Sequence, residues 1–119
     1  MKHEESNIQI VCVNWFRLMY PNLIMYTSLN GVKLSGTKIQ RKIKWNRLVQ
    51  EGAKAGVADL FLMHASNGFH GLYIEMKAPK GRHRPEQKAF EHSALLEGYE
   101  YKIARSLDEF IAIIKNYLA

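Results

Sequence analysis

The sequence predicts an α/β fold in which a small mixed β-sheet is flanked by helices. Its 119 residues fit one hydrophobic core and leave no room for a second. Helical apolar patterns stand near both ends, and short apolar runs between them are separated by glycine and proline turns. The expected order is α-β-β-β-α-β-α. No repeat or linker divides the chain, so we expect residues 1–119 to form one domain.

The first third of the chain predicts a helix and then a strand. Apolar side chains recur at helical spacing over residues 7–20, and a proline ends the pattern. Residues 23–27 follow as a strand, and Asn30-Gly31 indicates a tight turn. The stretch after this turn is basic and poorly periodic. We expect it to be a loop with a short helix around residues 39–49.

The middle third predicts a β-hairpin. Residues 57–63 form a nearly continuous apolar run, which is typical of a strand covered on both faces, and Asp59 is the single charge in it. Asn67-Gly68 marks a turn, and residues 72–77 read as the second strand. The two strands should therefore pair.

The last third predicts a helix, a strand and a closing helix. A proline at the first position suits a helix over residues 85–97, which stops at Gly98. Residues 99–104 form the next strand. Ser106 and Glu109 match the capping-box pattern that opens the closing helix.

The composition indicates a polyanionic partner and limits the kinds of metal site. Seventeen Lys and Arg against 11 Asp and Glu give a net charge of +6, which suits nucleic acid or an anionic membrane surface. The single cysteine, Cys12, excludes an internal disulfide and a zinc site built on several thiolates, and we expect a buried thiol. No apolar run reaches the roughly 20 residues that span a bilayer. We expect a cytoplasmic protein.

Three charged residues of the predicted hairpin form the candidate site. Glu75 and Lys77 project from one face of their strand, roughly 6.6 Å apart along it. If the hairpin brings Asp59 beside Glu75, two carboxylates converge, and a divalent cation relieves their repulsion. Ligation by oxygen alone favours Mg²⁺ or Mn²⁺ over zinc. Each feature has a structural alternative, because such an Asp can merely close a turn and a Glu-x-Lys pair can be a solvated face. Their combination favours the metal site.

Three segments resemble one nuclease family. Residues 56–60 (GVADL), 72–77 (LYIEMK) and 85–87 (PEQ) resemble the VRR-NUC domain, a branch of the PD-(D/E)xK superfamily with a restriction-endonuclease-like fold. Glu5 and Gln9 match a Glu-x-x-x-Gln signature on its first helix. Ala58 departs from the family, which usually has proline there. That position shapes the turn and supplies no ligand.

The resemblance implies a DNA endonuclease that depends on Mg²⁺ or Mn²⁺. Lys77 would orient or activate the attacking water, and Gln87 would help to position Lys77 or the substrate. Glu5 would be a further or second-metal ligand, and Met76 would bind through its backbone carbonyl. The implied metal ligands are Asp59, Glu75, Met76 and Glu5.

The resemblance also implies a homodimer that acts on branched DNA such as a four-way junction. The sequence alone shows neither property. The alternative is a non-catalytic nucleic-acid-binding module that keeps the fold and the basic surface. Intact Asp59, Glu75 and Lys77 count against this alternative, because a pure binder has no need for carboxylates that face phosphate.

Two basic clusters are candidate contacts to the DNA backbone. The first precedes a helix N-terminus, where N–H groups and the helix dipole favour phosphate. The second surrounds Trp45, which we expect to be buried rather than stacked on a base. Either cluster could instead be a solvated surface. The first cluster comprises Lys80, Arg82, His83 and Arg84, and the second comprises Lys38, Arg41, Lys42, Lys44 and Arg47.

Overall fold

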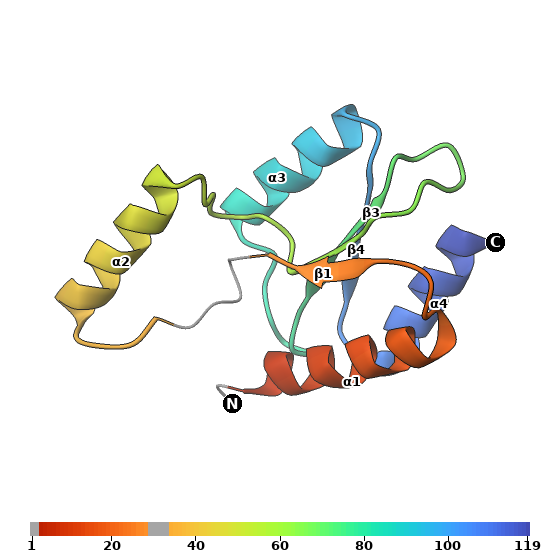
Figure 1. Ribbon diagram of the computed structural model, residues 1–119, viewed down its shortest axis with the longest axis horizontal. Coiled ribbons are helices and arrows are strands. Elements are labelled where there is room, and N and C mark those ends of the chain that lie inside the picture. The colour runs from red at the N-terminus through yellow and green to blue at the C-terminus, as the bar shows by residue number, and fades with distance from the viewer. Residues whose placement is uncertain (1–2, 29–33) are drawn as a thin grey trace.

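The computed structural model describes residues 3–28 and 34–119 of the chain (Figure 1). The predicted turn at Asn30-Gly31 lies outside the described residues. Within them, the elements follow the order α1, β1, α2, β2, β3, α3, β4, α4. This is the predicted order together with the helix expected around residues 39–49, which is α2 and lies between the first two strands.

The sheet of the described residues is mixed, as predicted. Its strand order is β1-β2-β3-β4. The pairs β1–β2 and β2–β3 are antiparallel, and β3–β4 is parallel. A parallel pair needs a crossover connection, and α3 provides it. The strands are β1 (Met25–Thr27), β2 (Leu60–Leu62), β3 (Leu72–Met76) and β4 (Glu100–Ala104).

The two faces of the sheet are covered differently. Ile74, between Leu72 and Met76 on β3, lies on the face that packs against α1 and α4 in the main hydrophobic core. Tyr73 lies on the opposite face, where its ring contacts Phe90 of α3. Glu75 shares this second face because side chains alternate along a strand. The helices are α1 (Glu4–Met19), α2 (Lys38–Gln50), α3 (Pro85–Leu96) and α4 (Leu107–Leu118).

The first two helices differ from the sequence-based expectation only in their bounds. The first helix begins at Glu4 rather than at residue 7, so Glu5 lies in its first turn. The basic stretch forms helix α2, whose bounds lie within one residue of the helix expected around residues 39–49. Thr37 caps it, because its side chain accepts from the Gln40 backbone while the Gln40 side chain accepts from the Thr37 backbone.

The strand that was expected to contain Asp59 is shorter than predicted. β2 begins at Leu60, and Asp59 occupies a bend directly before it. The register pairs Leu60 with Ile74, so a longer ladder would pair residue 58 with Met76. The Asp59 carboxylate instead accepts the Met76 N–H at 2.8 Å. The Asp59 side chain thus takes the place of the next backbone acceptor in the ladder, and β2 begins only at Leu60.

The remaining expectations are met in part. Cys12 is fully buried, which raises its pKa to about 11 and keeps the thiol protonated. Trp45 is only half-buried on α2, a helix with no buried residue. At α4, Ser106 accepts from the Glu109 N–H, but the Glu109 carboxylate accepts from the Arg105 N–H, so the capping box is half formed. No helix in the described part of the chain is long and apolar enough to cross a membrane.

Candidate active site

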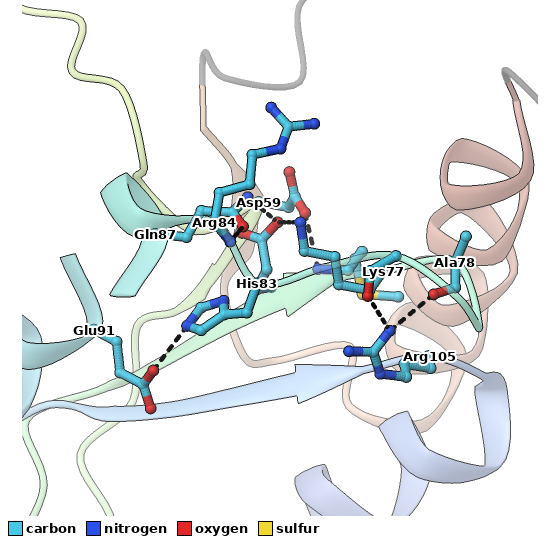
Figure 2. A network of polar contacts seen from close by, with 11 residues as sticks. Asp59, Lys77, Ala78, His83, Arg84, Gln87, Glu91 and Arg105 are labelled. Carbon is cyan, nitrogen blue, oxygen red and sulfur yellow. Dashed lines mark hydrogen bonds and ion pairs between the residues drawn. The ribbon is translucent and has the colours of Figure 1, made fainter. Parts of the chain in front are cut away.

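Asp59, Glu75 and Lys77 meet at one end of the β2–β3 pair. Figure 2 labels Asp59 and Lys77 in this site. Asp59 is anchored by the Met76 N–H, while Glu75 and Lys77 leave β3 on the same side. The Lys77 ammonium lies 3.8 Å from the Glu75 carboxylate, and each residue is only 3% exposed. A buried charge is costly unless it is paired or put to use. The arrangement therefore points to chemistry rather than to a solvated surface pair.

Both carboxyl groups of the site have a raised pKa, and burial is the largest cause for each. Burial and, after it, the Asp59 charge raise the pKa of Glu75 to about 8, although the Lys77 charge opposes the rise. Burial also raises the pKa of Asp59, although the Met76 N–H lowers it. Both shifts follow from placing two acids in a desolvated space with one nearby cation. A divalent cation would remove the cost of ionising them.

Gln87 connects α3 to this site. Its Nε2 donates to Oε2 of Glu75 at 3.0 Å, and its Oε1 accepts from the Arg84 N–H at 2.9 Å. The contact is thus with Glu75, whereas the sequence reading assigned Gln87 to Lys77 or to the substrate. Gln87 orients one oxygen of Glu75 from the first turn of α3.

Gly56 brings the turn before Asp59 against the same helix. Its φ of +92° lies in the left-handed region, and an added Cβ would meet the Glu86 carbonyl oxygen at 2.3 Å. Only glycine combines this backbone conformation with so close an approach. The resemblance segments 56–60 and 85–87 therefore touch in space, which places Asp59 and Gln87 on either side of Glu75.

The residues present fit a hard divalent cation. Oε1 of Glu75 is buried and has no hydrogen-bond partner among the described residues. The Met76 carbonyl points to the same side of β3 as its N–H, toward Asp59, because both groups of a strand residue share one direction. Two carboxylates and one backbone carbonyl form an oxygen-only donor set, which suits Mg²⁺ or Mn²⁺.

Glu5 remains outside this donor set. It is exposed in the first turn of α1, and its charge raises the pKa of both Asp59 and Glu75. The described residues contain no group of three or more His, Cys, Asp or Glu side chains that could hold one metal ion. Glu5 therefore lies near enough to act through its charge but is not brought together with the two carboxylates as a ligand.

The basic residues divide into exposed side chains and one that turns inward. Lys80, Arg82 and Arg84 are exposed beside the N-terminus of α3. The His83 side chain is only 15% exposed, bonds to Glu91 at 2.8 Å and lies with its ring 5.7 Å from that of Tyr101. The expected phosphate contact by His83 does not fit this orientation, because its ring is already engaged inside the domain.

The α2 cluster is on the surface throughout. Every residue of this helix is at least partly exposed, and it carries five cations and no acid. In Figure 1 the helix stands away from the sheet and the other helices. No acidic residue on the helix can pair with these cations, which are Lys38, Arg41, Lys42, Lys44 and Arg47.

Arg105 is a residue that the sequence analysis missed. It follows β4, and its Nη1 donates to the carbonyls of Ala78 at 3.0 Å and Gly81 at 2.7 Å (Figure 2). These carbonyls belong to the turn directly after Lys77. Arg105 carries no motif signal, so only its position after the parallel neighbour of β3 could have indicated it.

Two comparisons with known proteins found matches to the same family. The VRR-NUC domain matches residues 3–108 of the chain. A solved structure described as a VRR_NUC domain protein is 26% identical, with a TM-score of 0.69 over 95% of this chain and 86% of that one. No curated protein sequence matches significantly. The domain match covers most of the chain, including both carboxylates and the lysine, and the chain therefore belongs to the VRR-NUC family.

Proposed function

We propose that this nuclease-like domain is a metal-dependent endonuclease that hydrolyses phosphodiester bonds in DNA. One observation carries the proposal. The carboxylates of Asp59 and Glu75 share a desolvated space with an ammonium, that of Lys77, 3.8 Å from Glu75. This constellation matches the Asp…Glu-x-Lys core of the PD-(D/E)xK superfamily.

Mg²⁺ or Mn²⁺ would be held by the Asp59 and Glu75 carboxylates and the Met76 carbonyl. Such an ion makes hydroxide available near neutral pH and neutralises charge on the phosphate oxygens. Gln87 keeps one Glu75 oxygen turned toward α3, so the other oxygen, Oε1, is left for ligation. Glu5 adds negative charge from α1, and this charge favours cation binding at short range.

Lys77 would act on the water or on the phosphate. Its ammonium is buried next to the carboxylates, so it can donate hydrogen bonds to an attacking water or to a phosphate oxygen at the same place. Its positive charge would stabilise the negative charge that develops during attack. A side chain fixed in this way is already oriented before the substrate arrives.

DNA would lie across the basic side chains beside the site. Lys80, Arg82 and Arg84 stand at the N-terminus of α3, where the helix dipole adds to their positive potential. The cations of α2 would extend this contact along the backbone. Contacts of this kind position a duplex without reading its sequence.

We further propose that the protein acts as a homodimer on branched DNA. The support is the family resemblance described above, together with symmetry. Two sites related by a two-fold axis would suit paired cuts in a four-way junction. Light scattering of the purified protein, alone and with a junction, would measure the stoichiometry directly.

A cleavage panel tests the proposal. Purified protein would be incubated with single-stranded, duplex, flap and four-way-junction DNA in Mn²⁺, Mg²⁺ or EDTA. We expect cutting with either metal, strongest on the junction, and none in EDTA. Protein that binds these DNAs and never cuts them with either metal would instead be a non-catalytic binding module.

A further inference from the structure

The turn after Lys77 closes over the lysine side chain. The Gly81 N–H donates to the Ala78 carbonyl at 2.9 Å, which closes residues 78–81 into a turn. A Cβ added to Gly81 would stand 3.3 Å from Cδ of Lys77, so the glycine backbone lies directly against the aliphatic stem. The Lys77 N–H donates to the Ala104 carbonyl at 3.0 Å. Lys77 is thus enclosed between this turn and the end of β4.

Arg105 holds the turn in this closed position. Its Nη1 donates to the carbonyls of Ala78 and Gly81, and a longer contact of 3.5 Å reaches the Pro79 carbonyl. Three carbonyls that converge on one nitrogen form a local concentration of negative potential. A guanidinium suits this site because its positive charge is permanent and its donor groups lie in a rigid plane.

Arg105 is itself fixed from the other side. Its backbone N–H donates to the Glu109 carboxylate at 2.8 Å, in the first turn of α4. A continuous set of bonds therefore runs from α4 through Arg105 to the turn that encloses Lys77. Lys77 in turn lies 3.8 Å from Glu75.

We propose that Arg105 is a positioning residue for Lys77. It keeps the 78–81 turn closed, and the closed turn holds the lysine stem so that its ammonium stays beside Glu75. The role of Lys77 in cleavage rests on the function proposed above, whereas the enclosure of its side chain by the turn does not. A displacement of about 1 Å at a reacting group can lower a rate about a hundredfold, so loss of the clamp should be visible in catalysis.

The test compares Arg105→Met with Arg105→Lys and with Lys102→Met. Lys102 lies on the same strand region but is exposed, so its loss controls for the removal of one cation. In Arg105→Met we expect kcat to fall about 10- to 100-fold with KM changed less than about threefold. Arg105→Lys should recover part of kcat, because an ammonium can still donate to one or two of the carbonyls. Lys102→Met should keep the wild-type kcat.

A second readout does not depend on cleavage. Reductive methylation followed by mass spectrometry measures how fast each lysine is modified. We expect Lys77 to be protected in the wild type and in Lys102→Met, and to be modified at least about tenfold faster in Arg105→Met, since protection follows local opening. Lys80, which is exposed already, should react at the same rate in all variants.

The outcomes separate this inference from the proposed function. Unchanged kcat and unchanged protection of Lys77 in Arg105→Met would overturn the positioning role. Faster modification of every lysine, with a much lower Tm, would also overturn it, because Arg105 would then support the whole domain; Arg105→Lys repeats the test if the methionine variant fails to fold. A wild type that never cuts DNA would refute the function while the methylation rates still decide whether Arg105 holds Lys77.

Discussion

The Met76 N–H donates a hydrogen bond of 2.8 Å to Oδ2 of Asp59, and this bond connects the end of β3 to the bend before β2. It accounts for two features together. The carboxylate takes the place of a ladder acceptor, so β2 starts only at Leu60, and it comes to lie beside Glu75. Several experiments test what this juxtaposition does.

The first concerns the metal. Asp59→Asn keeps the shape of the side chain but removes its charge, so we expect cleavage to disappear and Mn²⁺ affinity to fall at least about tenfold, the range seen when a metal site loses a supporting group. Isothermal titration calorimetry with Mn²⁺ measures the affinity. Asp108→Asn, an exposed acid in α4, is the matched control and should bind Mn²⁺ as the wild type does. Normal Mn²⁺ binding by Asp59→Asn would remove Asp59 from the ligand set.

The second concerns the lysine. Lys77→Met retains the buried stem and deletes the ammonium, so turnover should fall about 10²- to 10⁴-fold, the usual contribution of a positioned proton donor or acceptor. Mn²⁺ should still bind, because both carboxylates remain. Single-turnover cleavage and calorimetry on the same preparation measure the two effects. Loss of Mn²⁺ binding in this variant would contradict the separation of roles.

The third concerns pH and stability. Folding raises the pKa of Glu75 from its ordinary value of 4.5 to about 8, so the folded state binds this proton more tightly than the unfolded state does. The resulting stabilisation is complete below pH 4.5 and is lost as the pH rises through about 8. The free energy of unfolding of the metal-free protein should therefore decline across this window.

Urea denaturation at several pH values measures that decline. Glu75→Gln should flatten it, whereas Glu97→Gln, which removes an exposed acid after α3, should leave it unchanged. Mn²⁺ should raise stability most at the high-pH end, where the metal replaces the proton. Equal pH slopes for the wild type and Glu75→Gln would show that Glu75 is not the group responsible.

The fourth concerns DNA binding. Neutralising Lys80, Arg82 and Arg84 with glutamine should weaken binding to all DNAs alike and reduce the slope of log K against log [salt] by about 0.9 for each lost phosphate contact. His83→Gln should not change that slope, because the His83 ring faces Glu91 and Tyr101. Fluorescence anisotropy measures the slope for each variant at salt concentrations from about 50 to about 200 mM, a range in which phosphate contacts strongly affect affinity. An altered slope for His83→Gln would show that His83 does contact a phosphate.

The sequence was sufficient for the fold class and for the charged trio. Periodicity located α1, a proline and a glycine bounded α3, and a capping-box pattern marked the start of α4. The alternation along residues 72–77 placed Glu75 and Lys77 on one face, as found. Turn signals led to the β2–β3 hairpin. These features are local, so a pattern within about ten residues contains the information.

The remaining features depend on long-range contacts. The late start of β2 follows from a bond between Asp59 and Met76, which are 17 residues apart, so the local sequence around either residue does not predict it. The orientation of His83 depends on Glu91 and Tyr101 from two other elements. Arg105 was missed for the same reason, because its carbonyl partners lie more than twenty residues earlier.

The parallel pairing of β3 with β4 has a consequence for biosynthesis. Lys77 is bonded to the end of β4, and the clamp on its turn comes from Arg105, so both supports are translated well after the carboxylates. A nascent chain that has emerged only as far as α3 contains the acidic pair without the neighbouring strand that encloses the lysine. Assembly of the site around Lys77 is thereby deferred until β4 and Arg105 have left the ribosome.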